Sequence, residues 1–248
     1  MSAPVLGVAG LQKAYGAIRA VDGVSFDVVA GEIFGVIGPN GSGKTTMFNA
    51  VLGQIRPDAG TIALDGRDIT GLSPVALNRR GVGRTFQTLQ VFGKMSVRDN
   101  LLVAAQEHRG TLLSRMFAPA DSGLGARADA LLEQFRLREV AARPAGSLSY
   151  GQQKLVDIAM AFMSEPRLVL LDEPCAGVNP SLVGDIGLLL KALNRGRGGS
   201  FIVIEHNMDF VMRLAHRVLV LAEGRVLAEG SPDAVRAHPG VMEAYLGA

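Results

Sequence analysis

The sequence has no tryptophan and only one cysteine, Cys175, among its 248 residues. A single cysteine excludes an intramolecular disulfide and a cysteine-based zinc cluster, so we expect the chain to work in a reducing, intracellular compartment. Aromatic residues make up only 5% of the chain against 48% hydrophobic residues, which predicts a core packed mainly from aliphatic side chains. This hydrophobic content also excludes disorder as the main state.

Long apolar runs and long runs of like charge are also missing. The longest apolar runs, such as Leu168 to Leu171 and Val218 to Ala222, are far shorter than the ~20 residues that a membrane-spanning helix needs. The first residues lack the basic start and apolar stretch of a secretory signal, so we expect no secretion. With 25 basic and 23 acidic residues and no block of five like charges, no nucleic-acid partner is expected.

Short apolar runs broken by glycine dominate the first and last parts of the chain. The segment from Val5 to Ile37 is typical of antiparallel strands. Further along, buried strands that alternate with amphipathic helices indicate a parallel α/β sheet. The strands are expected at 33–37, 168–171 and 201–204, the helices at 45–52 and 182–193, and a final strand pair at 218–221 and 225–228.

The middle of the chain has a helical pattern instead. Helices are predicted at 97–107, 126–137 and 152–163, and a segment with Gly, Pro and Ser separates the first two at 110–125. We therefore expect one α/β domain over 1–248. Its parts are a catalytic core with an antiparallel β region, 1–95 and 166–248, and an inserted helical lobe, 96–165.

A glycine-rich stretch follows the first buried strand directly and opens a predicted helix. It matches the G-x-x-x-x-G-K-[ST] pattern of phosphate loops, in which backbone N–H groups and a helix N-terminus face nucleotide phosphates. Lys44 is expected to reach the β- and γ-phosphates, Thr45 to bind Mg²⁺, and Thr46 to contact a further phosphate. The matching residues are Gly38, Pro39, Asn40, Gly41, Ser42, Gly43, Lys44 and Thr45.

Two acids end the strand expected at 168–171. Because a parallel sheet binds its ligand at the carboxyl ends of its strands, Asp172 is predicted to lie on the Mg²⁺ side of the site. Glu173 points the other way off the strand end and can act as general base for an attacking water. The alternative is a pair of solvated acids. His206 follows the third strand at the same edge, where a histidine taken alone is more often a capping or surface residue.

Further motifs resemble those of ABC-type ATPases over essentially the whole chain. Leu148-Ser149-Tyr150-Gly151-Gln152 resembles the signature motif of that family, with Tyr150 in place of its commonest Gly. Arg84-Thr85-Phe86-Gln87 resembles the Q-loop, and Ala176-Gly177-Val178-Asn179 resembles the D-loop, with Asn179 where many relatives have Asp. His206 resembles the switch histidine, and Tyr15 sits where the family places an aromatic ring against adenine.

The resemblance implies an ATPase that uses ATP and Mg²⁺. It implies that Gln87 contacts the metal or the water, that Glu173 is the catalytic base, and that His206 senses the γ-phosphate. ABC domains sandwich two ATP molecules head to tail between two copies. The signature residues Ser149, Tyr150, Gly151 and Gln152 are therefore expected to act on ATP held by a partner subunit.

Within the family, the chain looks most like the first of the two ATP-binding subunits of branched-chain amino acid importers. The similarity rests on the Thr-Phe-Gln form of the Q-loop, the segment 110–125, the run Ile204 to Met208, and the ending Glu243 to Gly247. It implies a second ABC ATPase in a homodimer or heterodimer, transmembrane permeases and, indirectly, an extracytoplasmic solute-binding protein. The expected location is the cytoplasmic face of the membrane, peripheral through the permeases.

Several alternatives stay open. A lipopolysaccharide-export ATPase shares the closing Tyr-Leu-Gly, although the Q-loop context fits it less well. A second alternative is a soluble ABC ATPase, which would usually have coiled-coil arms, a duplicated cassette or a strong basic face; the sequence indicates none of these. A third is a scaffold that binds ATP without hydrolysing it, and the presence of Glu173 and His206 argues against it. Cys175 is either a packed small residue or a redox-sensitive thiol. A cluster beside Gln87 is either lobe core or a permease-docking groove: Phe86, Leu89, Val91, Phe92 and Met95.

Overall fold

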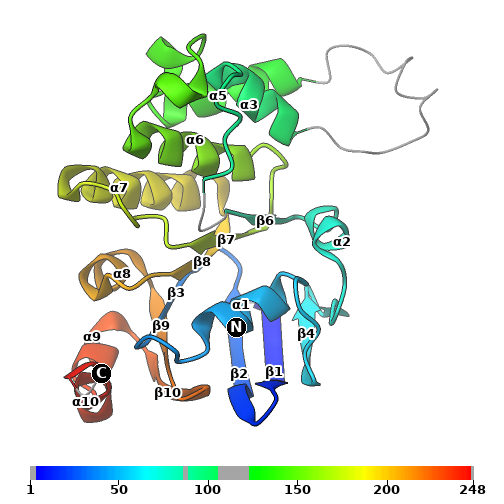
Figure 1. Ribbon diagram of the computed structural model, residues 1–248, viewed down its shortest axis with the longest axis vertical. Helices are drawn as coiled ribbons and strands as arrows, with labels where there is room; N and C mark the ends of the chain where they lie inside the picture. Colours follow the sequence, from blue (N-terminus) through cyan, green and yellow to red (C-terminus); the bar gives the residue numbers. More distant parts are fainter. Residues whose placement is uncertain (1–3, 86–88, 106–122, 247–248) are drawn as a thin grey trace.

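The computed structural model describes residues 4–85, 89–105 and 123–246 (Figure 1). A four-stranded antiparallel sheet has the order β2-β1-β4-β5. Its long central strand β1 (Pro4–Tyr15) pairs with β2 (Ile18–Val29) on one side and β4 (Ala59–Leu64) on the other, and β5 (Arg67–Asp68) completes the edge. The antiparallel region predicted for the first part of the chain is confirmed.

A second sheet has six strands in the order β10-β9-β3-β8-β7-β6. The pairs β9-β3, β3-β8, β8-β7 and β7-β6 are parallel, and β10 is antiparallel to β9. The predicted parallel sheet and the closing strand pair are thus both present. The strands are β3 (Ile33–Ile37), β6 (Val82–Arg84), β7 (Leu168–Asp172), β8 (Ser200–Ile204), β9 (Arg217–Ala222) and β10 (Arg225–Gly230).

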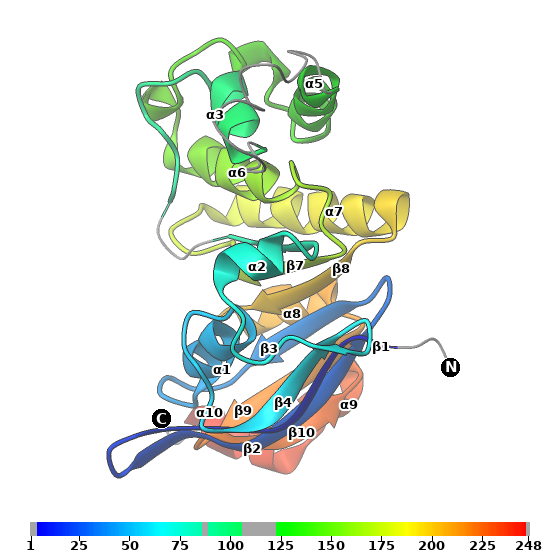
Figure 2. The same cartoon turned by 90° about the vertical axis from the view of Figure 1, so that its right-hand side faces the viewer.

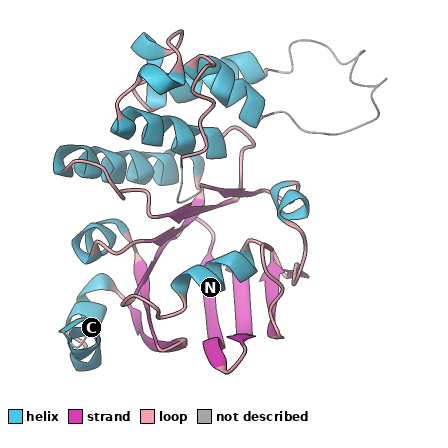
Figure 3. Ribbon diagram, in the orientation of Figure 1, coloured by secondary structure: helices cyan, strands magenta, loops and turns pink. Residues whose placement is uncertain are grey.

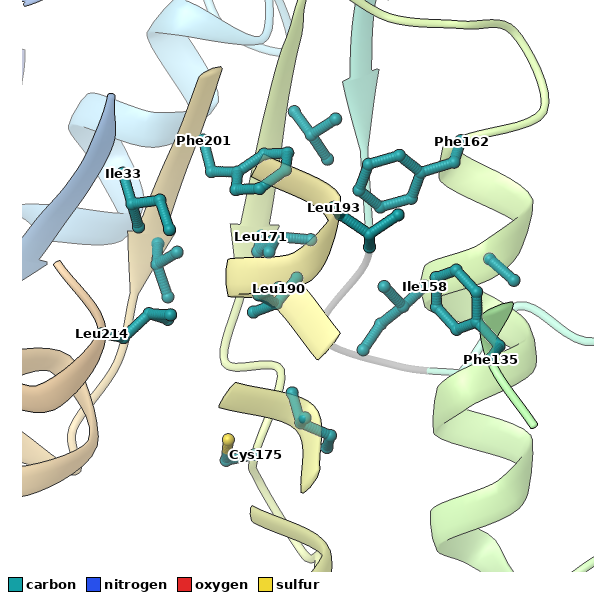
Figure 4. Close-up of a cluster of buried hydrophobic side chains, with 14 of the residues drawn as sticks. Ile33, Phe135, Ile158, Phe162, Leu171, Cys175, Leu190, Leu193, Phe201 and Leu214 are labelled. Atoms are coloured by element: carbon teal, nitrogen blue, oxygen red, sulfur yellow. The ribbon is translucent and has the colours of Figure 1, made fainter. Parts of the chain in front are cut away.

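The interiors of the parallel strands β3, β7, β8 and β9 are apolar because both faces of their sheet are covered. Side chains alternate along β7, so that Leu171 packs on the helical side and Leu170 on the side of the antiparallel sheet. Phe201 and Ile202 of β8 divide in the same way. Figure 4 shows the helical side, where Phe162 meets Phe201 edge to face at 5.7 Å between ring centroids. The central sheet therefore separates two apolar cores.

The helices lie on both faces of this sheet and at one end of it: α1 and α2 pack on the side of the antiparallel sheet, and α7 and α8 on the other side (Figures 1 and 3). The helices α3, α5 and α6 pack together at the end farthest from β10, and α7 lies between them and the sheet (Figures 1 and 2). The bounds are α1 (Lys44–Val51), α2 (Pro74–Asn78), α3 (Val97–Ala104), α5 (Leu124–Gln134), α6 (Tyr150–Ala161), α7 (Pro180–Arg197), α8 (Met208–Leu214), α9 (Pro232–Arg236) and α10 (Pro239–Leu246). The division into a core and a helical lobe stays a prediction.

The bounds of two helices differ from the predicted ones because of local caps. Ser149 caps α6 in a capping box with Gln152, so the helix begins at Tyr150, two residues before the predicted start. Gly123, at φ +74°, caps α5, which ends at Gln134 just before Arg136 at φ +56°. Left-handed backbone cannot continue a right-handed helix, so α5 starts and stops earlier than its apolar pattern indicates.

Candidate functional site

The predicted phosphate loop joins β3 to α1. Lys44 in the first turn of α1 is buried, and its ammonium donates hydrogen bonds to the carbonyl oxygens of Gly38 and Pro39 at 2.8 Å and to Ser42 Oγ at 3.3 Å. Burial lowers the pKa of Lys44, and the charge of Glu173 opposes this effect. The side chains of Thr45 and Thr46 follow in the same turn, exposed and half-buried respectively. A fixed positive charge and two hydroxyls thus lie around the loop.

Two glycines of this loop have no room for a side chain. A Cβ on Gly38 would lie 2.1 Å from the carbonyl oxygen of Leu221 in β9, and one on Gly43 would lie 2.1 Å from that of Ala20 in β2. Gly43 also has φ +95° and is the N-cap of α1. The loop is therefore clamped between the two sheets, and the first N–H groups of α1 are left without side-chain caps, as an anion site at a helix N-terminus requires.

Two acids and a histidine meet at the carboxyl ends of β7 and β8. Glu173 Oε1 lies 2.9 Å from His206 Nε2. Glu173 has φ +47°, uncommon for any residue but glycine, and its N–H donates to the carbonyl oxygen of Ile204 at 2.9 Å. Burial raises the pKa of the neighbouring Asp172 to about 6, and the charge of Glu173 adds to this effect. Glu173 and His206 thus meet where β7 and β8 end.

Glu205 also belongs to this site, although the sequence patterns did not single it out. Its carboxylate is 3% exposed and accepts the N–H of Cys175 at 2.7 Å and the N–H of His206 at 3.2 Å. Burial raises the pKa of Glu205, and these backbone donors oppose that effect. The residue ties the segment after Glu173 to the segment that carries His206. An acid directly after an apolar strand was the available signal.

The oxygen donors of this site fit a magnesium ion that is shared with a nucleotide. Mg²⁺ usually takes one or two protein oxygens together with phosphate oxygens and water. Thr45 offers a hydroxyl and Asp172 a carboxylate, whereas no cluster of three His, Cys, Asp or Glu side chains could hold a metal alone within the ranges that the structure describes. Gln87, the third predicted ligand, lies outside the described residues, as does Phe86.

The signature stretch lies far from the phosphate loop of its own chain. Its Ser149 is exposed at the start of α6 and accepts the N–H of Gln152 at 3.3 Å. Figures 1 and 2 both place α6 and α1 on opposite sides of α7 and β7. A Cβ on Gly151 would lie 2.3 Å from Leu182 Cδ2, so the start of α6 packs closely on α7. The structure thus does not bring Ser149 to the nucleotide loop within one chain.

The predicted D-loop contacts the signature directly. A Cβ on Gly177, at φ +71°, would lie 3.0 Å from Cε1 of Tyr150, so the ring covers this glycine. Asn179 is the N-cap of α7, and its side-chain oxygen accepts the N–H of Leu182 at 2.9 Å. Asparagine and aspartate cap helices equally well, which gives a physical reason why Asn179 can stand in place of the family's Asp.

Two further residues singled out from the sequence, Tyr15 and Cys175, differ in their exposure to solvent. Tyr15 ends β1 with 52% of its side chain exposed, and the ammonium of Lys13 lies 5.7 Å from the centre of its ring. An exposed ring in this place is free to stack on a flat ligand. Cys175 is buried in the helical-side core (Figure 4), and burial raises the pKa of its thiol. These observations favour the packed interpretation of Cys175, because the reactive form of cysteine is the thiolate.

Two family models match the chain. One described as ABC transporter covers residues 21–176, and one described as branched-chain amino acid ATP-binding cassette transporter covers residues 225–248. The high-affinity branched-chain amino acid transport ATP-binding protein BraF of Pseudomonas aeruginosa is 40% identical over 253 residues, which cover 100% of this chain and 99% of that relative.

Solved structures agree with the fold and with nucleotide binding. The ADP conformation of MJ1267, an ATP-binding cassette of an ABC transporter, has a TM-score of 0.89 at 35% identity and covers 100% of both chains. A dimeric post-hydrolysis state of the ATP-binding cassette MJ0796, bound to ADP and Pi, has a TM-score of 0.78 at 26% identity over 92% of this chain and 98% of that chain. The fold and the family resemblance inferred from the sequence are confirmed: the chain belongs to the ABC transporter family, as an ATP-binding cassette whose ATP hydrolysis is coupled to transport.

Proposed function

We propose that this ATPase powers an importer of branched-chain or related hydrophobic amino acids. The observation that carries the proposal is that a full-length relative and a separate family model point to the same transported solutes. The full-length relative BraF is named for this transport, and a separate family model for the same transport matches the last part of the chain, 225–248.

In the proposed chemistry, some residues bind the nucleotide and its magnesium ion, and others activate the attacking water. Lys44, Thr46 and the loop N–H groups hold the phosphates, and Thr45 and Asp172 hold Mg²⁺, which when bound neutralises phosphate charge. Glu173 accepts the proton of the attacking water, because its carboxylate stands at the strand end beside the loop. His206 Nε2, 2.9 Å from Glu173 Oε1, orients that carboxylate and contacts the γ-phosphate. Gln87 contacts the metal or the water, and Tyr15 stacks on adenine.

We propose a head-to-tail dimer as the working form. The exposed N-terminus of α6 presents Ser149, Tyr150, Gly151 and Gln152 away from the phosphate loop of the same chain, so these residues serve ATP on the partner subunit. The dimeric cassette MJ0796, bound to ADP and Pi, supports the formation of a dimer. The partner subunit is a second copy of this chain or a homologous ABC ATPase.

A groove beside the Q-loop is the proposed docking site for the permeases. It has a volume of about 420 Å³ and opens between α2, β6 and α6. Val75 lines this groove and is 62% exposed, and Gln90, which also lines it, comes from the chain segment of the predicted docking cluster. No helix within the described part of the chain is long and apolar enough to cross a membrane. We therefore place the subunit at the cytoplasmic face of the membrane, held there by permeases that receive solute from an extracytoplasmic binding protein.

Reconstitution tests the proposal. The chain, its partner ATPase and the permease pair are placed in proteoliposomes, and uptake of labelled leucine, isoleucine and valine is measured with ATP on the side of the cassettes. We expect uptake that stops with Glu173→Gln. A complex that hydrolyses ATP but accumulates none of the three amino acids would overturn the assigned substrate class.

A further inference from the structure

The end of strand β1 that carries Tyr15 extends beyond the strand on one side of it. The pairing of β1 with β4 runs as far as Gln12, which lies opposite Ala59, the first residue of β4. From there β1 continues to its last residue beside β2, with Tyr15 opposite Ile18. A two-stranded ribbon is only marginally stable by itself, so the position of the Tyr15 ring depends on contacts from outside the pairing.

Asp58, the residue directly before β4, binds this edge of β1. Its backbone N–H donates to the carbonyl oxygen of Gln12 at 2.8 Å, and its Oδ2 accepts the N–H of Ala14 at 2.7 Å. Its Oδ1 accepts a hydrogen bond from the ammonium of Lys13 at 2.7 Å. The ammonium of Lys13 and the N–H of Ala14 lower the pKa of Asp58 below its ordinary 3.8, so the carboxylate is ionised at neutral pH. One residue thus holds the three residues directly before Tyr15.

Lys13 carries this restraint to the ring of Tyr15. The two side chains lie on the same face of β1 because they are two residues apart. The ammonium of Lys13 is 5.7 Å from the centre of the Tyr15 ring, within the range of a cation–π contact. The Lys13 side chain is only 18% exposed, and the same ammonium lies 2.7 Å from the Asp58 carboxylate. Asp58 therefore fixes both the backbone before Tyr15 and the cation beside its ring.

Asp58 also lies on the connection that follows the phosphate-loop helix. The helix α1 begins at Lys44 and ends at Val51, and the chain then runs through Asp58 into β4. The connection is itself held to α1, since the N–H of Gln54 donates to the carbonyl oxygen of Asn49 at 2.9 Å. The acid thus joins the element that begins in the phosphate loop to the strand end that carries the exposed ring.

We propose that Asp58 is a positioning residue of the nucleotide site, which holds the Tyr15 ring against adenine while the phosphate loop binds the phosphates. The inference rests on the proposed stacking of Tyr15 on adenine and is independent of the transported solute. Loss of the Asp58 carboxylate leaves the ammonium of Lys13 and the N–H of Ala14 without this partner, so the ring is held less firmly in the stacking position. ATP binding should then weaken through its base and not through its phosphates.

Asp58→Ala tests the proposal with two ligands. We expect the affinity of the chain for ATP, measured by calorimetry, to fall about 3- to 10-fold, the scale of one hydrogen bond to a charged group. The affinity for inorganic tripolyphosphate, which has no base, should stay the same. Asp58→Asn keeps one oxygen acceptor and should lose less ATP affinity than Asp58→Ala.

Tyrosine fluorescence gives a second readout. The chain has no tryptophan and three tyrosines, so its emission comes from tyrosine. The part of the quenching by ATP that Tyr15→Phe removes is the signal of Tyr15. In Asp58→Ala this part should be weaker than in the unmodified chain, because the ring stacks on adenine less of the time.

A matched control lies on α5. Asp129 forms an ion pair with Arg98 at 2.8 Å, and its side chain is 50% exposed against 49% for Asp58. Asp129→Ala should leave the affinities for ATP and for tripolyphosphate unchanged.

Two results would overturn the proposal. An equal fall in affinity for ATP and for tripolyphosphate in Asp58→Ala would indicate a general loosening of the site. Unchanged ATP affinity in Asp58→Ala would also overturn it, and Tyr15→Ala then separates two cases. If Tyr15→Ala lowers ATP affinity, only the role of Asp58 fails; if it does not, the proposed adenine stacking fails as well.

Discussion

The carboxylate of Asp157 gives a pH-dependent stability that can be worked out from its surroundings. Asp157 on α6 is 4% exposed and lines the proposed permease groove. Its Oδ1 accepts a hydrogen bond from the N–H of Gln90 at 3.3 Å, whereas its Oδ2 has no hydrogen-bond partner among the described residues. Burial raises its pKa from the ordinary 3.8 to about 6, although the bond from Gln90 and the charge of Lys154 pull it down. Ionised Asp157 is therefore less favourable in the folded chain than in the unfolded one.

The sign and size follow from proton linkage. The folded chain keeps this proton between pH 4 and 6 while the unfolded chain has lost it, so stability falls as the pH rises through this window and levels off above it. A pKa rise from 3.8 to about 6 corresponds to a total of about 3 kcal/mol, of which about 1.4 kcal/mol is lost between pH 5 and pH 7.5. Asp157→Asn cannot ionise and escapes this loss.

Urea unfolding of both chains at pH 5 and pH 7.5 measures the effect. The stability of Asp157→Asn relative to the unmodified chain should increase by about 1.4 kcal/mol between the two pH values. Asp129→Asn provides a control that should not change between these two pH values, because Arg98 donates to Asp129 at 2.8 Å and lowers its pKa below the ordinary 3.8, so that this carboxylate is ionised in the folded and the unfolded chain at both. A stability difference for Asp157→Asn that does not change with pH would refute the reasoning.

Three further substitutions test the nucleotide site and the dimer. Lys44→Ala removes the buried ammonium over the phosphate loop, so ATP binding and turnover should both collapse; unchanged affinity in a nucleotide titration would contradict the phosphate-loop assignment. Glu173→Gln should still bind ATP while hydrolysis falls ~10²-fold or more, and chromatography with Mg²⁺-ATP should show a trapped dimer; full hydrolysis would move the base role elsewhere. Ser149→Arg should spare ATP binding by the monomer but abolish hydrolysis, and a large loss of affinity at concentrations where no dimer forms would argue against the head-to-tail arrangement.

The strands of the parallel core could be predicted because each is visible as a local pattern in the sequence. Leu168 to Leu171 and Phe201 to Ile204 are continuous apolar runs, and both faces of the sheet that they form are buried. The strand β6 (Val82–Arg84) was not predicted, since three residues with a central glycine carry no periodicity. The strand β4 was missed for a different reason: it pairs with β1 across about fifty residues of chain, and no local pattern encodes that pairing.

The site was predictable where a motif fixes backbone and chemistry together. The phosphate loop is such a case, because a Cβ at Gly38 or Gly43 would lie only 2.1 Å from a backbone oxygen, so that both positions require glycine. Glu205 was not singled out because its significance arises from tertiary contacts with the N–H groups of Cys175 and His206.

The burial of Cys175 has a practical consequence for following motion in this protein. It is the only cysteine of the chain, it is 8% exposed, and burial raises the pKa of its thiol. Maleimide dyes react with thiolates at the surface, so the unmodified chain should remain unlabelled. A single reporter cysteine introduced on the exposed face of α6 or beside the groove would then be the only labelled position, and changes in the surroundings of its dye during ATP turnover could be recorded as fluorescence on an otherwise native sequence.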